Sequence, residues 1–247
     1  MFADPSFAPG VLVAAGLAMF AGALVQGSLG LGAGLVVVPV LGLAAPERLP
    51  QVLILTTLPL AVAMAVRERA ALRPRAVAWL TFGAVPGAVA GLGLVLWVPG
   101  PALGVLFGAV TLVGSLAGLS RLGVVPSDRA RLLAGLAAGV MGSSAGLAGP
   151  PLALLHARSE RDELRATLAV VFVVVSLETL AGLAAVGRLA PVDLGLSVLL
   201  LGPMAAGFVA SQRLDRGLSA LAVRRGVLLA AAAAGLVLLV QASAKLA

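Results

Sequence analysis

Hydrophobic stretches separated by short polar segments run along almost the whole chain. They cover residues 11–43, 50–66, 76–98, 102–120, 131–156, 166–187, 191–212 and 226–243. Since a helix needs about 20 apolar residues to span a bilayer, most of these stretches have the length of one spanning helix. The polar segments between them are too short for a soluble domain. The pattern therefore predicts an all-α polytopic membrane protein.

The first and fifth stretches differ from the others because each contains a glycine-rich interruption, at Gly27–Gly34 and at Gly142–Gly149. The first stretch is too long for one span and too short for two, so we expect two consecutive helices of about 14–16 residues joined at the glycines. Non-helical backbone survives in a bilayer only where protein or a water-filled cavity supplies its hydrogen bonds. Two such breaks at matching positions in two halves point to the binding site of a transporter.

The positions of lysine and arginine distinguish two topologies. If all eight stretches cross the membrane, the positive residues divide almost evenly between its two sides. If the first and fifth stretches are re-entrant hairpins, one side keeps only Arg48, Arg188 and Lys245 of the 17 lysines and arginines, and the other 14 face together. Because positive residues of short loops favour the cytoplasm, we expect two hairpins, six full spans and both termini outside. The alternative is that the breaks are packing glycines in long tilted helices.

Each half of the chain would then contain one broken segment and three transmembrane helices, in residues 1–125 and 126–247 of a single integral-membrane unit. An odd number of crossings per half inverts the two repeats relative to each other, and inverted repeats place substrate near the midplane of the bilayer. Weak internal repetition supports the duplication. The segment Gly30-Leu31-Gly32-Ala33 aligns with Gly146-Leu147-Ala148-Gly149 at an offset of 116 residues.

Composition supports the membrane assignment and narrows the chemistry. Hydrophobic residues make up 61% of the chain, charged residues 11%, and the mean hydropathy is +1.13, whereas globular domains carry about 25% charge. The net charge of +7 arises from arginines in short loops, which indicates orientation and contact with an anionic lipid bilayer, and no nucleic-acid partner is expected. The chain contains no cysteine, so disulfides and thiolate metal sites are excluded. We expect no metal or cofactor.

The two breaks provide the candidate binding site. A helix that restarts after a break presents unpaired N–H groups and the positive end of its dipole, and such ends bind anions without a charged side chain. The candidate substrate-binding residues, which include hydroxyl and amide donors beside the breaks, are Gln26, Ser28, Gly30, Gly32, Gly34, Ser143, Ser144, Gly146, Gly149 and Pro150. For the serines, hydrogen bonding to their own helix is an equally open alternative.

Other polar residues in the apolar stretches have weaker assignments. Glu178 is the only acidic residue deep in a hydrophobic stretch, and burial favours its neutral form, so we expect it to couple transport to protons. A structural hydrogen bond to a neighbouring helix is the alternative. Thr56 and Thr57 precede Pro59, and we expect them to line the pathway or to satisfy backbone near a kink. The only histidine, His156, is expected to be a solvated loop residue.

At the two breaks the chain resembles the TauE/SafE family of membrane permeases, often called sulfite exporters. The family's first signature, Gly-x-Gly-Gly-Gly followed by proline, is matched by Gly30–Gly34 and Pro39. Its second, Gly-x-Gly-Gly-Pro, is matched by Gly146–Pro150. Ala33 and Ala148 replace glycines of these motifs, and alanine disfavours positive φ, so the local turns are expected to differ.

The resemblance implies a secondary transporter of small anions, such as sulfite or organosulfonates, in a bacterial-type inner membrane. It would work by alternating access and be coupled to H⁺ or Na⁺. The alternative is an ion-coupled carrier of a cation or another small metabolite, because carbonyls of a broken helix can also coordinate Na⁺. An enzyme is not expected. The segment Gly142–Gly146 matches the pattern Gly-x-Ser-x-Gly, but that motif has meaning only in the strand–turn–helix of a soluble α/β sheet.

Overall fold

A computed structural model describes residues 8–30, 32–45, 48–98, 100–119, 125–155, 161–214 and 220–244, and the regular secondary structure in these ranges is all helical. The predicted all-α fold is therefore confirmed. The α-helices are α1 (Pro9–Leu29), α2 (Ala33–Ala44), α3 (Gln51–Arg67), α4 (Pro74–Trp97), α5 (Gly100–Leu119), α6 (Asp128–Ala145), α7 (Gly149–Leu155), α8 (Arg161–Ala185), α9 (Pro191–Leu214) and α10 (Ala220–Ala244), and a short 3-10 helix, Arg69–Ala71, precedes α4.

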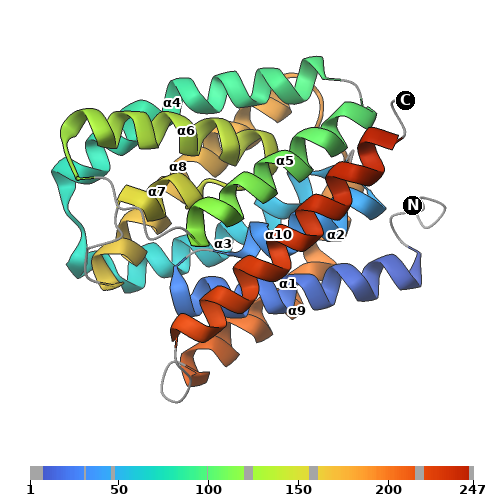
Figure 1. Cartoon of the computed structure of the whole chain (residues 1–247), viewed down its shortest axis with the longest axis horizontal. Helices are drawn as coiled ribbons and strands as arrows, with labels where there is room; N and C mark the ends of the chain where they lie inside the picture. Colours follow the sequence, from blue (N-terminus) through green and yellow to red (C-terminus); the bar gives the residue numbers. More distant parts are fainter. Residues whose placement is uncertain are drawn as a thin grey trace.

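The helices form an elongated bundle, with α5 and α10 crossing obliquely over the others (Figure 1). Within the described ranges, four helical segments are long and apolar enough to cross a membrane, namely Pro9–Ser28, Pro74–Trp97, Asp162–Ala185 and Pro191–Gln212. Of the other long helices, α3 has 17 residues, α5 has 20 and α10 has 25. By length, then, α1 can cross the membrane, and among the helices expected to span it fully only α3 is shorter than the usual 20 residues or so.

Each glycine-rich break produces a hairpin with two unequal arms. α1 has 21 residues and α2 has 12, while α6 has 18 and α7 has 7. In the first hairpin α2 runs back along α1. The two helices approach closely at Gly22, where a Cβ would lie 3.0 Å from the Cα of Ala33 and 3.3 Å from the side chain of Val37. The expectation of two similar helices of about 14–16 residues was wrong. Earlier glycines stay helical, and the first helix of each pair ends only where φ becomes positive, at Gly30 and Gly146.

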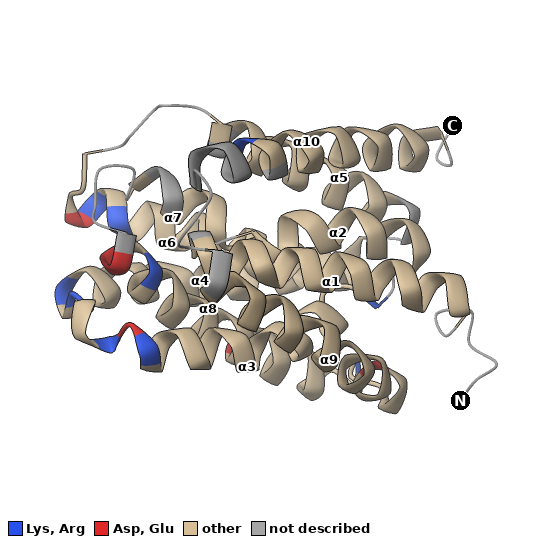
Figure 2. Ribbon diagram, turned by 90° about the horizontal axis from the view of Figure 1, so that it is seen from below, with Lys and Arg blue, Asp and Glu red and all other residues tan. Residues whose placement is uncertain are grey.

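Charge is distributed unevenly along the bundle. α1 begins and α10 ends at one end of the molecule, and most charged residues gather at the opposite end (Figure 2). There Arg73 pairs with Glu163 of α8 at 2.9 Å, and Arg75 of α4 pairs with Asp128 of α6 at 2.7 Å. The hydrogen bond from Arg75 holds the pKa of the Asp128 carboxyl below its usual value. These ion pairs connect the helix ends that meet at the charged end.

Small residues allow the long helices to approach closely. In the contact of α4 with α6, a Cβ at Gly87 would overlap the backbone oxygen of Leu136, and one at Gly139 would overlap that of Ala84. In the contact of α5 with α10, a Cβ at Gly235 would lie 3.0 Å from the backbone nitrogen of Leu112. Lipid is as apolar as the side chains, so membrane helices associate through close packing of this kind.

The helix contacts repeat when each of the first five helices is replaced by its counterpart among the last five, with α1 corresponding to α6, α2 to α7, and so on to α5 and α10. α1 packs on α9 as α6 packs on α4, and α3 packs on α9 as α8 packs on α4. α2 contacts α10 as α7 contacts α5, while α3 contacts α8 and α5 contacts α10. Two related halves would produce this pattern. The repeat boundaries at residues 125 and 126 stay a prediction.

Candidate functional site

A small cavity lies where the two glycine-rich breaks meet. It leaves about 50 Å³ for the centres of water-sized molecules, which is room for several waters. The breaks between α1 and α2 and between α6 and α7 form part of its wall, and α3 and α8 form the rest. The lining residues are Gln26, Gly32, Ala33, Gly34, Leu35, Leu53, Ile54, Thr57, Ala61, Gly142, Gly146, Leu147, Ala148, Gly149, Pro150, Phe172, Val175 and Ser176.

The first break is shaped by two glycines and one glutamine. Gly30 has a φ of +87° and closes α1 by donating its N–H to Gln26 O at 2.7 Å, and Gly32 precedes α2 with a φ of +129°. Side chains with a Cβ rarely adopt these conformations. The Oε1 atom of Gln26 accepts a hydrogen bond from Ala33 N at 3.2 Å. The Gln26 side chain of α1 thus caps the N-terminus of α2 across the break.

The second break closes in a similar way but offers fewer donors. Gly146, with a φ of +71°, donates its N–H to Gly142 O at 2.8 Å and ends α6. α7 then begins with Gly149, Pro150 and Pro151. Proline has no N–H, so two of the first three residues of this helix cannot donate to an anion. The second break therefore offers fewer backbone N–H donors to an anion than the first.

The breaks contact each other directly. A Cβ at Gly34 would lie 2.5 Å from Gly146 O and 2.8 Å from the side chain of Leu147. Only a residue without a side chain fits between these atoms. The alanines that replace motif glycines do not disturb the turns, because no described non-glycine residue has a positive φ, and Ala33 is already the first residue of α2.

Of the candidate residues from the sequence, about half line the cavity. Those that do are Gln26, Gly32, Gly34, Thr57, Gly146, Gly149 and Pro150. The cavity lining does not include Ser28, Gly30, Ser143, Ser144, Thr56 or Glu178. His156 lies outside the described residues.

The predicted hydroxyl donors are directed to their own helices. Each hydrogen-bonds the carbonyl four residues earlier, at 2.9 Å for Ser28, 2.8 Å for Ser143, 2.6 Å for Ser144, and 2.7 Å for both Thr56 and Thr57. A hydroxyl has one proton, so these groups have no donor left for an anion. For the serines, the structure favours back-bonding over the role expected from the sequence.

Comparison with known protein families identifies the family of the chain. The family model described as Sulfite exporter TauE/SafE matches residues 14–238, which include both breaks and all the lining residues. The chain belongs to this family. The family and the long apolar helices identify the chain as a multi-pass membrane protein of the permease type. No curated protein and no solved structure matches the chain.

Ser176 is a cavity residue of this TauE/SafE chain that the sequence analysis missed. It lies on α8, lines the cavity and is 9% exposed. The sequence pattern did not single it out, because the nearby polar residue Glu178 lies on nearly the opposite face of the helix, so the polar positions do not indicate which face is turned inward.

Glu178 lies on a different face of α8. One turn later, a Cβ at Gly182 would meet the side chain of Leu92 on α4, and residues four apart share a helix face. Glu178 is therefore placed on the side of α8 that packs against α4. Its Oε2 atom is buried and has no hydrogen-bond partner among the described residues.

Arg165 was counted from the sequence as one of the orientation charges, yet it is only 5% exposed. Its Nη2 donates to Ser28 O in the last turn of α1, and its Nη1 lies 4.0 Å from Glu68 Oε1. The stem of the side chain packs against Gly30, where a Cβ would come within 2.9 Å of Arg165 Cγ. A buried cation thus holds the first break to the charged end of the molecule.

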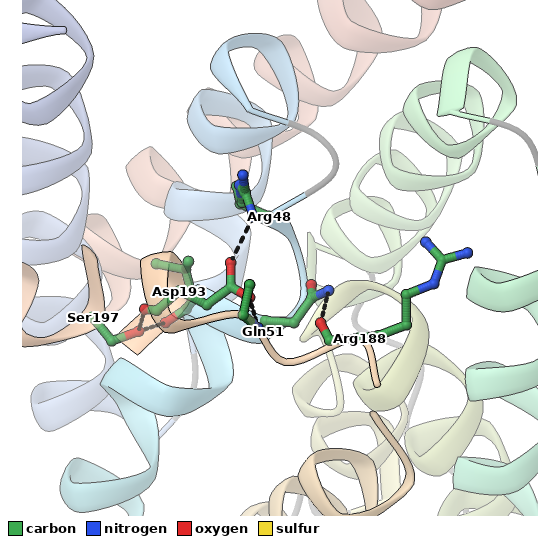
Figure 3. A network of polar contacts seen from close by, with 7 residues as sticks. Arg48, Gln51, Arg188, Asp193 and Ser197 are labelled. Atoms are coloured by element: carbon green, nitrogen blue, oxygen red, sulfur yellow. Dashed lines mark hydrogen bonds and ion pairs between the residues drawn. The ribbon is translucent and has the colours of Figure 1, made fainter. Parts of the chain in front are cut away.

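A second arginine, Arg48, anchors a polar network between the connection before α3 and the start of α9 (Figure 3). Its Nη1 lies 3.4 Å from Oδ1 of Asp193, a carboxylate that is 1% exposed. The other oxygen of Asp193 accepts from Ala190 N at 2.8 Å. Beside it, Gln51 Nε2 donates to Arg188 O at 3.3 Å. This network joins the connection before α3 to the start of α9.

Proposed function

We propose that the chain is a secondary transporter of small anions, such as sulfite or an organosulfonate, which it holds in the cavity between the two breaks. The observation that supports this most is the donor character of the first break. The side-chain oxygen of Gln26 accepts from Ala33 N, which leaves the amide NH₂ of Gln26 for a ligand. The N–H of Gly34 has no acceptor among the described residues. These donors lie at the positive end of the α2 dipole.

A cation carrier is the second candidate because the cavity also contains acceptors. Gly146 O lies at the contact between the breaks, and the Thr57 oxygen keeps lone pairs after its proton is donated to Leu53 O. Backbone carbonyls and hydroxyls of this kind coordinate Na⁺ in other broken-helix transporters. Among the described residues, the lining contains no Asp or Glu side chain, which favours the anion.

Alternating access requires that each end of the cavity can open. We propose that the Arg165 contacts with Ser28 and Glu68 close one end, and that the pair of Arg48 with Asp193 closes the other. The repeated pattern of helix contacts supports this proposal. Arg48 lies just before α3 and Arg165 in the first turns of α8, and α3 and α8 correspond in that pattern and both line the cavity.

For the orientation, we propose a bacterial-type inner membrane with the arginine-rich end in the cytoplasm and both termini outside. Positive residues of short loops favour the cytoplasmic side, and most of the charge gathers at the end opposite the first and last helix ends (Figure 2).

The proposed function is tested with purified protein, in detergent and in liposomes. We expect sulfite to raise the unfolding temperature and to enter protein-containing liposomes, because a ligand at about 100 times its dissociation constant stabilises the folded state by roughly 2.7 kcal/mol. Acetate, sulfate and Na⁺ salts of inert anions serve as comparisons. Stabilisation and flux that depend on Na⁺ alone would replace the anion transporter with the cation carrier.

For Glu178 we propose a role in proton coupling. Replacing it with Gln keeps the shape of the side chain and removes the exchangeable charge, so accumulation driven by a pH gradient is expected to disappear while downhill flux continues. Asp162→Asn, at an exposed position in the first turn of the same helix, is the matched control and keeps both activities. Accumulation that still follows the pH gradient in Glu178→Gln would remove this residue from coupling.

A further inference from the structure

We infer that Gln26 and Ser176 form a pair of donors that selects the substrate of this cavity, a small oxyanion without a cationic group. The inference rests on the proposed function, since it names the residues and the substrate class of that same site.

Ser176 keeps its hydroxyl proton for a ligand. The other candidate hydroxyls in the breaks and on α3 donate to their own helix, whereas the Ser176 hydroxyl has no hydrogen-bond partner within the described part of the chain. Its side chain is 9% exposed and lines the cavity. A nearly buried hydroxyl without a protein partner is costly unless something else pairs with it, and the cavity is where that partner can bind.

Gln26 presents a donor because its amide has only one favourable orientation. Its Oε1 accepts from Ala33 N at 3.2 Å, and the reversed amide would place an NH₂ group against that N–H. Two donors facing each other leave both unpaired, so the hydrogen-bond network fixes the amide. The NH₂ group has no acceptor among the described residues, and the 5% exposed side chain lines the cavity.

The two donors come from the two halves of the chain, Gln26 from α1 and Ser176 from α8. A ligand that both can reach must carry at least two acceptor atoms on a compact group. The cavity leaves about 50 Å³ for the centres of water-sized molecules, which is room for several waters and for an anion as small as sulfite. Much of the remaining lining is apolar, with Leu53, Phe172 and Val175 among its residues.

The same lining rejects a zwitterion. The described lining residues include no carboxylate, so an ammonium group on the substrate would lose its water without gaining a charged partner. Specificity of this kind arises as much from the unpaired group as from the favourable contacts. We therefore expect methanesulfonate to compete with sulfite and aminomethanesulfonate, which differs by one amino group, to compete poorly.

The test compares Ser176→Ala and Gln26→Met with Thr179→Val in sulfite uptake by liposomes. Thr179 is the matched control, because it lies one turn after Ser176 on α8 but donates to Val175 O and does not line the cavity. Ser176→Ala and Gln26→Met should each raise the KM for sulfite by about 10- to 100-fold, as expected for a hydrogen bond to a charged group. Thr179→Val should keep the wild-type KM.

Folding is followed separately by the unfolding temperature without ligand. Gln26→Met also removes the cap of α2 and can lower that temperature, whereas Ser176→Ala removes no protein hydrogen bond and should leave it unchanged. Wild-type KM values in both variants, or equal competition by the two sulfonates, would overturn this inference and leave the anion transporter standing. If the wild-type protein transports no oxyanion into liposomes, the proposed function itself is overturned.

Discussion

Replacing Gly34 with alanine is expected to abolish transport, although the substitution adds a single methyl group. The new Cβ would lie 2.5 Å from Gly146 O and 2.8 Å from the Leu147 side chain. Gly146 has no room to move away, because its Cα already packs against the side chain of Leu53. Overpacking of this kind costs about 1–3 kcal/mol, which exceeds the gain of up to about 1 kcal/mol from replacing glycine in a helix. Transport rates in liposomes and unfolding temperatures in detergent measure the effect.

Gly93→Ala is the matched control for this substitution. Gly93 also lies in an apolar helix, α4, but a Cβ there would meet nothing within 4 Å. This variant should transport at the wild-type rate and unfold at the same or a slightly higher temperature, since alanine favours helix. If Gly34→Ala behaves in the same way, close contact between the two breaks is not required for transport.

Arg165→Ala is expected to have the second large effect, on both stability and transport. The substitution removes the donor that pairs with Ser28 O at the end of α1 and leaves the Glu68 carboxylate without this neighbour. A hydrogen bond from a charged group contributes about 1.5–3 kcal/mol, and a buried acceptor left unpaired adds to the loss. We expect a lower unfolding temperature together with a loss of uptake.

Two further variants identify the cause of that effect. Arg73→Ala removes an arginine of the same end whose side chain is 70% exposed and paired with Glu163, and exposed ion pairs contribute little. It should therefore retain the stability and activity of the wild-type protein. Arg165→Lys keeps the charge but not the geometry of the guanidinium, and should recover part of the stability. Equal behaviour of Arg165→Ala and Arg73→Ala would assign Arg165 to membrane orientation alone.

Local chemistry explains which features could be predicted from the sequence. Composition and the length of the apolar stretches predicted an all-α membrane protein because each spanning segment must satisfy its own backbone in lipid. The positions of the breaks were also predictable, since Gly30, Gly32 and Gly146 have positive φ, which glycine adopts without strain. The two motifs at these positions predicted the TauE/SafE family, and the family match over residues 14–238 confirmed it.

Tertiary packing decided which polar groups meet in the cavity. The polar residues in the middle of α8, Ser176 and Glu178, lie on different faces of the helix and give no sign of which face turns inward, so Ser176 was missed. The direction of a hydroxyl proton depends on the rotamer, which sets Ser143 and Ser144 on their own helices.

The sequence by itself determined the class of protein, the two breaks and the family, because these depend on composition and on the conformation of single residues. Only the tertiary structure decided that Gln26 caps α2 across the break and that Arg165 is buried against α1. Both depend on groups from separate helices coming within hydrogen-bond distance. The local pattern of either segment carries no information about that distance.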